Sequence, residues 1–155
     1  MTGRNYWFVM LTVAVLLVSG LFGSRDCLAA DKVRVRVTQI KASNNNGDAV
    51  DPALGGLGKR LKRKYRYRSF KLVTAKSQSI GQGASASYAL ANGMTLAVKV
   101  VSVDGKTIGL SVTISKGGAA VTAFTVRSRN DATFLTNVPW GQDLLILAIR
   151  PTLGG

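Results

Sequence analysis

The stretch Met94–Ser115, MTLAVKVVSVDGKTIGLSVTIS, places two alternating apolar segments on either side of one Asp-Gly pair. In its second half, Ile108, Leu110, Val112 and Ile114 alternate with small or polar residues. A period of two residues is typical of a strand that is buried on one face only. Because Asp-Gly between two such segments is a strong signal for a tight turn, the stretch predicts an antiparallel hairpin.

The register of this hairpin follows from its apolar pattern. A two-residue turn at Asp104-Gly105 would set the apolar residues of the first strand opposite Ser and Gly. Two alternatives avoid this mismatch, namely a three-residue loop over Asp104–Lys106 or a bulge near Val100-Val101. Both place the same apolar side chains on the core face: Leu96, Val98, Leu110, Val112 and Ile114.

The rest of the chain after residue 65 has the same character. Strand-like segments recur with turn signals about every 8–13 residues, which predicts an antiparallel β-sandwich or barrel-like sheet. Pro139-Trp140-Gly141 is one of these turn signals, and Leu144–Ile149 (LLILAI) predicts a central strand buried on both faces. The other candidate strands are Lys32–Lys41, Arg66–Ala75, Ser77–Ile80 with Ser85–Leu90, Val121–Ser128 and Ala132–Thr136.

One short helix is expected near residues 52–64, so the fold class is mostly β (α+β). Asp51 suits the N-cap of this helix, and Pro52 suits its first position. Leu54, Leu57 and Leu61 follow at spacings of three and four residues and share one face. Three glycines weaken the segment, so we expect it to be helical only when it is packed against the sheet.

Residues 1–30 have the pattern of a secretory signal peptide. Arg4 precedes the apolar run Tyr6–Phe22, and the small residues Ala29 and Ala30 follow a short polar step. This pattern predicts export with cleavage after Ala29 or Ala30, which leaves residues 31–155 as a single β-rich domain in the periplasm or outside the cell. The alternative is an uncleaved inner-membrane signal anchor, because about 17 apolar residues reach the lower limit of a membrane span. Lipidation at Cys27 is disfavoured by the charges just before it.

The composition of the domain disfavours enzymatic function. Beyond residue 30 the chain has 19 Lys and Arg against six Asp, a net charge of +13, and no His, Cys or Glu. It therefore lacks the imidazole base and the thiolate of common nucleophilic sites, and it lacks the usual zinc and copper ligands. Most of the aspartates stand beside turn-forming residues, which indicates turns and caps. We expect a non-enzymatic protein with no catalytic residues, no metal and no cofactor.

The feature that most suggests a binding site is Lys59–Lys71, KRLKRKYRYRSFK, with eight bases, three aromatic residues and no acid. Bases interleaved with aromatic rings suit an anionic polymer or surface, such as lipid headgroups, lipopolysaccharide, acidic polysaccharide or nucleic acid. A solvated basic face, or a protein interface, would have the same pattern. The candidate anion-binding residues are Arg34, Arg36, Lys59, Arg60, Lys62, Arg63, Lys64, Tyr65, Arg66, Tyr67 and Arg68.

Four segments carry a resemblance to known proteins: VRVTQIKAS, DPALGGLGKRLK, YRYRSFKLV and FLTNVPWGQDLLILAIRP. Their order resembles that of small exported bacterial β-rich proteins of unassigned function. The closing apolar strand before Arg150-Pro151 is also similar to the last strands of outer-membrane secretin subunits, although the chain lacks the rest of that pattern. The resemblance implies a β-rich envelope protein and supplies no catalytic residue.

Two functional hypotheses follow from the sequence. The first is a non-enzymatic structural or binding domain of the bacterial cell envelope, which acts through contacts with an envelope protein or a surface. The second is a binder of anionic polymer or membrane surface through residues 59–71 together with Arg34 and Arg36. The sequence implies no small-molecule substrate and does not specify an oligomeric state.

Overall fold

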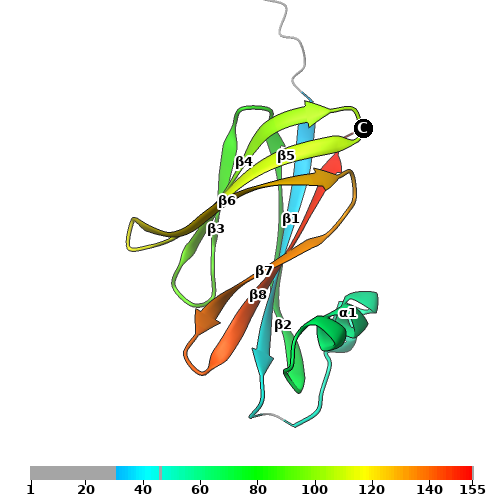
Figure 1. The fold of residues 1–155 in the computed structure, drawn as a ribbon, viewed down its shortest axis with the longest axis vertical. Helices are drawn as coiled ribbons and strands as arrows, with labels where there is room; N and C mark the ends of the chain where they lie inside the picture. Colours follow the sequence, from blue (N-terminus) through cyan, green and yellow to red (C-terminus); the bar gives the residue numbers. More distant parts are fainter. Residues whose placement is uncertain (1–30, 46, 155) are drawn as a thin grey trace, which may run out of the picture.

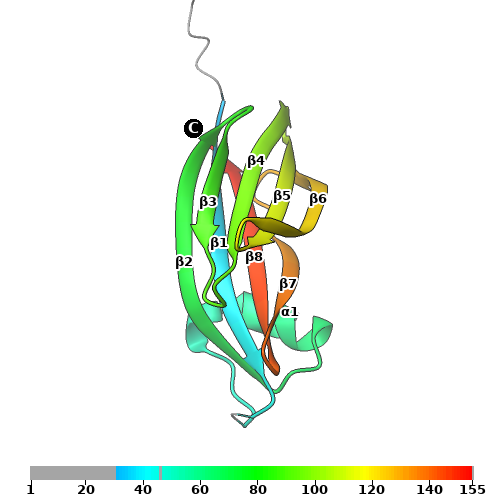
Figure 2. The ribbon, with the colours of Figure 1, turned by 90° about the vertical axis from the view of Figure 1, so that its left-hand side faces the viewer.

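The computed structural model describes residues 31–45 and 47–154. They form two four-stranded antiparallel sheets packed face to face, with one short helical segment at one end (Figures 1 and 2). The predicted mostly β sandwich with a helix near residues 52–64 is therefore confirmed. The predictions of a signal peptide, its cleavage site and a possible anchor concern residues that lie outside the described part.

The strands fall into two groups by position in the chain. Sheet A has the order β2 (Ser69–Gly81), β1 (Lys32–Ser43), β8 (Asp143–Leu153) and β7 (Phe134–Trp140). Sheet B has the order β3 (Ser85–Ala89), β4 (Thr95–Asp104), β5 (Thr107–Lys116) and β6 (Ala119–Arg129). A 3-10 turn, η1 (Pro52–Leu54), leads into the helix α1 (Gly56–Lys64).

The main core lies between the sheets. Alternating residues of β1, β4 and β5 point into it, and the five residues assigned to the core face of the hairpin are all fully buried there. The prediction that the β8 segment is buried on both faces is also confirmed. Leu145, Leu147 and Ile149 belong to the main core, whereas Ile146 and Ala148 belong to a second cluster on the opposite face of sheet A.

The second cluster explains why residues 52–64 form a helix. Leu54 and Leu61 are buried against the outer face of sheet A, beside Ile40 and Phe70. Asp51 caps the segment as predicted, because its Oδ1 accepts a hydrogen bond from Ala53 N at 2.9 Å. Its Oδ2 also accepts one from Leu72 N at 3.2 Å. One aspartate therefore caps the helical segment and attaches it to β2.

The hairpin of β4 and β5 contains the predicted bulge. Asp104 pairs with Thr107, so the two turn residues are Gly105 and Lys106. The alternative of a three-residue loop over Asp104–Lys106 was therefore wrong, as was the placement of a turn at Asp104-Gly105. The bulge leaves Val101 between two paired residues and 48% exposed. Opposite it, a Cβ on Gly109 would meet the Ser102 hydroxyl, so a side chain there would require Ser102 to change its rotamer.

Three boundaries differ from the sequence prediction. β2 is one strand rather than two, because it bends at a bulge beside Gln39 and continues through its exposed second half. The segment 65–68 is a connection rather than part of that strand. Pro139 and Trp140 lie inside β7, and the turn is formed by residues 141–142. Proline is tolerated there because β7 is the edge strand of its sheet.

Two buried polar side chains connect the sheets. Gln39 on β1 points inward, where its Nε2 donates to Ala89 O at 2.8 Å and its Oε1 accepts from Ala91 N at 2.9 Å. The Tyr88 hydroxyl on β3 donates to Val35 O at 2.9 Å, and burial raises the pKa of this tyrosine to about 12. These bonds fix the β3–β4 hairpin against β1.

Candidate functional site

The predicted basic residues of the helix lie at one pole of the sandwich, where α1 packs on the outer face of sheet A (Figure 1). All five are exposed: Lys59, Arg60, Lys62, Arg63 and Lys64. Three of these, Lys62, Arg63 and Lys64, stand in the last turn, where positive charge also stabilises the helix dipole. The positive charge of the last turn therefore has a structural reason of its own.

Few of these bases are neutralised within the chain. Lys62 Nζ lies 3.2 Å from Asp48 Oδ1, and Arg60 Nη1 donates to the backbone oxygen of Thr133 at 3.1 Å. Lys64 lies over the Tyr65 ring, 5.5 Å from its centre. Within residues 31–45 and 47–154 there are three ion pairs, and only the one made by Lys62 involves α1. Most of the helix charge is therefore available to an external anion.

The aromatic residues of the predicted site take a different place. Tyr65 and Tyr67 are half-buried and pack against the second cluster, and burial raises the pKa of Tyr65. Arg66 and Arg68, which alternate with them, are exposed. The rings therefore help to attach the helix-to-strand connection to the sheet, which leaves less of their surface for stacking on bases or sugars.

Arg34 and Arg36 lie on the same outer face of sheet A as α1, in the half that the helix leaves uncovered. Along β1 this face changes from Arg34 and Arg36 to Ile40, and along β8 it changes from Arg150 to Ile146. The apolar half lies under α1 and the basic half is exposed. Arg34 lies two residues before Arg36 on the same face of β1, farther from the helix.

A cleft of about 230 Å³ follows the boundary between the two halves. Leu54 and Leu57 line it on the helical side, and Arg36 and Arg150 line it on the sheet side. The structure therefore brings Arg36 close to the helical segment, as the sequence hypothesis required. The sequence analysis missed Arg150, because its position beside Arg36 depends on the pairing of the first strand with the last.

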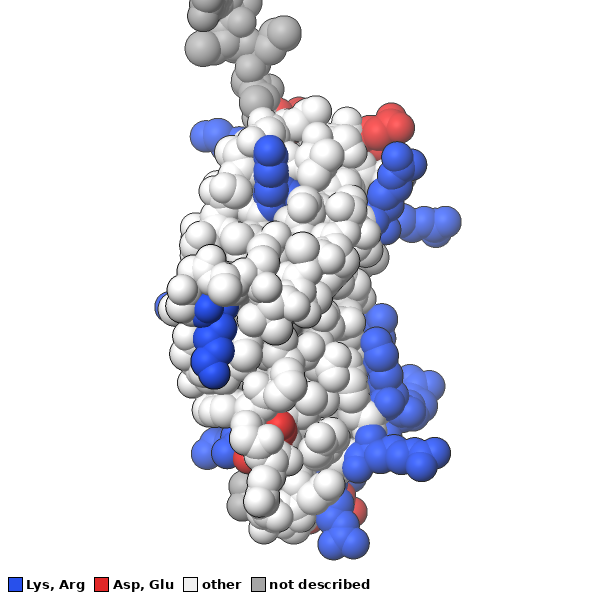
Figure 3. All heavy atoms as spheres, turned by 60° about the vertical axis from the view of Figure 1, so that its left-hand side comes forward, with Lys and Arg blue, Asp and Glu red and all other residues white. Residues whose placement is uncertain are grey.

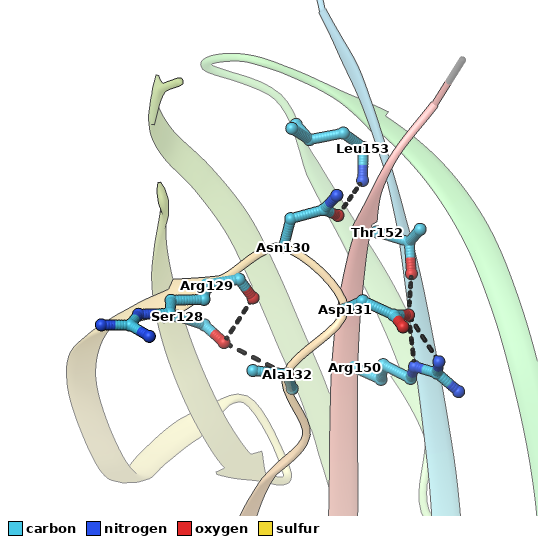
Figure 4. Close-up of polar contacts among 8 residues, drawn as sticks. All are labelled: Ser128, Arg129, Asn130, Asp131, Ala132, Arg150, Thr152 and Leu153. Carbon is cyan, nitrogen blue, oxygen red and sulfur yellow. Dashed lines mark hydrogen bonds and ion pairs between the residues drawn. The ribbon is translucent and has the colours of Figure 1, made fainter. Parts of the chain in front are cut away.

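Asp131 holds Arg150 in place (Figure 4). Both Nε and Nη2 of Arg150 lie 2.6 Å from Asp131 Oδ1. The hydrogen bond from Arg150 lowers the pKa of this carboxyl, so the ion pair persists below the ordinary range of aspartate. Asp131 itself has a positive φ of 67° and donates its backbone N–H to Pro151 O at 2.9 Å. Residues 130 and 131 form a turn, as expected for aspartates that stand beside turn-forming residues.

Three of the other aspartates have structural partners as well. Asp143 Oδ2 lies 3.0 Å from Lys41 Nζ, and hydrogen bonds from Ser43 and Lys41 lower the pKa of its carboxyl. Asp51 is the helix cap and Asp48 pairs with Lys62. No group of three potential metal ligands occurs among the residues that the structure describes.

Charge is unevenly distributed over the surface. In Figure 3, Lys and Arg side chains project from the margins of the face shown, most densely along its right-hand edge. The middle of that face is almost free of charge. In the described part of the chain, no helix is both long enough and apolar enough to cross a membrane.

Comparison with known proteins identifies no family. No family model and no curated protein matches the chain. Among solved structures, the cryo-electron microscopy structure of the T2SS secretin XcpQ from Pseudomonas aeruginosa is similar, with 9% sequence identity and a TM-score of 0.41. The match covers 81% of this chain and 59% of the secretin chain. A similarity of this strength supports no functional conclusion.

Proposed function

We propose that this chain is a non-enzymatic binding domain of the bacterial cell envelope that adheres to anionic surfaces through α1. The observation that carries the proposal is the exposure of five bases on one short helix, of which only Lys62 has a carboxylate partner among the described residues. A compact group of uncompensated positive charge raises the local concentration of anions.

The packing of α1 determines the kind of binding. Leu61 is fully buried and Leu57 is partly buried against sheet A, so the apolar side of the helix is occupied. A helix of this kind cannot bury an apolar face in a bilayer, as amphipathic surface helices do. Adhesion through α1 is therefore electrostatic and must weaken steeply as ionic strength rises.

The assignment as a non-enzymatic protein rests on the chemistry of the available groups. The domain has no His, Cys or Glu beyond residue 30, and Asp48, Asp51, Asp131 and Asp143 have structural partners. General acid–base catalysis needs a titratable group that can reach a substrate. The described surface offers bases and hydroxyls in quantity and few free carboxylates.

Replacing Lys59, Arg60, Lys62, Arg63 and Lys64 together with Gln should abolish retention on heparin or on vesicles rich in anionic lipid. The unfolding temperature should change little, because exposed charges each contribute at most about 1 kcal/mol. The measurement is the salt concentration that elutes each protein. The matched control replaces five exposed bases outside the stretch 59–71: Lys76, Lys99, Lys106, Lys116 and Arg127. Equal loss in the control would show that net charge alone drives retention and would contradict a site on α1.

The export hypothesis gives a separate prediction. If the leader is cleaved as its pattern indicates, intact mass measurement of the native protein should give an N-terminus at Ala30 or Asp31. The mature protein should then be found in the periplasmic or extracellular fraction. Intact Met1 in a membrane fraction would contradict cleavage and would establish the signal anchor instead.

A second candidate is a domain that binds an envelope protein, and the edge strand β6 favours it. No described residue pairs with the outer edge of β6, and the strand carries no charge and no proline from Ala119 to Val126. Edge strands of natural proteins are usually protected by charged residues, proline or a short length, so an unprotected one suits the addition of a partner strand. Binding of this kind would persist at salt concentrations that release an anionic polymer.

A further inference from the structure

The cleft beside α1 has an apolar wall and a basic wall. On the helical side Leu54 and Leu57 supply apolar surface, and the floor is the row of small residues Ala75, Thr38 and Ala148 across β2, β1 and β8. The next row across the same strands is Ser77, Arg36 and Arg150. A ligand in the cleft would therefore meet apolar groups at one end and guanidinium groups at the other.

The two arginines of the cleft are unequal. Arg36 and Arg150 are directly opposite each other in the ladder between β1 and β8. Like charges in this arrangement are unfavourable unless something neutralises them. Asp131 neutralises Arg150 alone, through the two contacts at 2.6 Å. Arg36 has no ion-pair partner among the described residues.

Asp131 is fixed in position and cannot serve both arginines by moving. The loop that carries it is attached to β8, because Asn130 Oδ1 accepts from Leu153 N at 2.8 Å (Figure 4). The Asp131 N–H also donates to Pro151 O. Thr152 Oγ1 also contacts Asp131 Oδ1 at 3.5 Å. The carboxylate therefore stays on the β8 side, and the anion that would balance Arg36 is absent from the described chain.

The helical wall of the cleft is also fixed. Arg60 Nη1 on α1 donates to Thr133 O at 3.1 Å, which joins the helix to the chain segment between β6 and β7. Leu54 and Leu61 are buried beneath the same helical segment. The cleft is therefore formed before any ligand arrives. Its volume of about 230 Å³ is several times the roughly 30 Å³ that a water molecule occupies in the liquid.

We propose that this cleft binds a small amphiphilic anion, with the anionic head on Arg36 and a short apolar chain against Leu54 and Leu57. The chemical class is a carboxylate or phosphate monoester that carries an alkyl group. The site is distinct from the exposed bases of α1, so it goes beyond the adhesion proposed above. Arginine suits this role because its planar guanidinium forms paired hydrogen bonds with carboxylate and phosphate oxygens.

The test is a calorimetric titration of the full domain with octanoate, octyl phosphate and inorganic phosphate. Octanoate or octyl phosphate should bind, and inorganic phosphate should bind much more weakly because it leaves the apolar wall unused. Arg36→Gln should weaken binding of the amphiphile by about tenfold to a hundredfold, as expected for loss of a charge-assisted contact. Arg34→Gln is the matched control, since Arg34 is exposed on the same face of β1 but does not line the cleft.

A second variant keeps the test independent of Arg36. Ala75 is exposed on the floor of the cleft, so Ala75→Glu should fill the space, place a carboxylate near Arg36 and abolish binding without unfolding the domain. Arg36→Gln should barely change the unfolding temperature, because Arg36 is exposed and has no ion-pair partner among the described residues. Equal binding by the wild type, Arg36→Gln and Ala75→Glu would overturn the proposal, as would inorganic phosphate binding as tightly as octyl phosphate.

Retention on anionic vesicles then separates the two possible sources of the ligand. If the anion is the end of a membrane lipid, Arg36→Gln should lower vesicle retention more than Arg34→Gln does. If it is a free molecule, the two variants should be retained alike while their octanoate affinities differ. The titration uses only variants outside α1, so vesicle retention by the five-fold Gln variant would contradict adhesion through α1 and leave the titration result unaffected.

Discussion

Replacing Leu147 with Ala should lower the free energy of unfolding by about 3 kcal/mol, within the range of about 2–5 kcal/mol for buried leucines. Leu147 is fully buried in the main core, on the strand β8 that pairs with β1 and β7. The loss combines the transfer free energy of the removed methyl groups with the cost of the remaining cavity. For a domain that is stable by about 5–15 kcal/mol, this is a large fraction of the total.

Urea denaturation followed by circular dichroism measures this effect as a lower midpoint with an unchanged slope. Val101→Ala is the control, since Val101 is a strand residue of the same chemical kind that the bulge leaves 48% exposed. Its free energy of unfolding should change by less than about 0.5 kcal/mol. Similar losses in the two variants would contradict a core between the sheets.

Gln39→Leu should destabilise the domain by about 2–4 kcal/mol, because two backbone groups would lose their partner and each costs about 1–3 kcal/mol when left unsatisfied. Gln39 is only 2% exposed, and its amide bonds both Ala89 O at the end of β3 and Ala91 N in the β3–β4 connection. Leucine fills a similar volume, so the effect reports on hydrogen bonding rather than on a cavity. Differential scanning calorimetry measures the loss.

Gln78→Leu is the matched control for this variant. Gln78 Nε2 also donates to a backbone oxygen of β3, that of Ser87 at 3.0 Å, but this bond is exposed to water. Its loss should cost less than about 0.5 kcal/mol, since water replaces the donor.

Gln39→Glu adds a pH test: the protonated acid can donate to Ala89 O and a carboxylate cannot. Because burial raises the pKa of a folded carboxyl, the deficit relative to wild type should be smallest below about pH 4, the ordinary pKa of glutamate in the unfolded chain, and should grow as pH rises above it. A deficit independent of pH would contradict the role assigned to the donor.

The sequence predicted the parts of the fold that depend on local periodicity. The alternation of Ile108, Leu110 and Val112 identified the inward face of β5, and the unbroken apolar run of β8 identified a strand between two clusters. The Asp51-Pro52 start of the helical segment followed from capping chemistry. In each case the signal lies within a few neighbouring residues, because the environment of the strand or helix imposes a period on its own side chains.

The errors occurred where the outcome depends on distant parts of the chain. β2 reads as two strands because its exposed second half, near Lys76, has no apolar period, and only pairing with β1 shows that it is continuous. Trp140 reads as a turn residue until its pairing with Asp143 is known. The cleft was missed for the same reason, since Arg36 and Arg150 are 114 positions apart and meet only across β1 and β8. One signal was available in the sequence: the residues of the outer face change from Arg36 to Ile40 along β1 and from Ile146 to Arg150 along β8.

The positions of α1 and the start of β1 have a consequence for how the domain could be held in the envelope. β1 begins at the pole opposite α1 and runs the length of the sandwich (Figure 1), which for 12 residues is about 40 Å. Electrostatic attraction is screened within about 8 Å at physiological salt. A domain tethered through an uncleaved leader could therefore extend α1 away from the anchoring membrane, toward whatever lies on its other side. If the leader is removed instead, the domain could turn its bases to either surface, and under the proposed function it would then be a diffusible adhesin rather than a spacer.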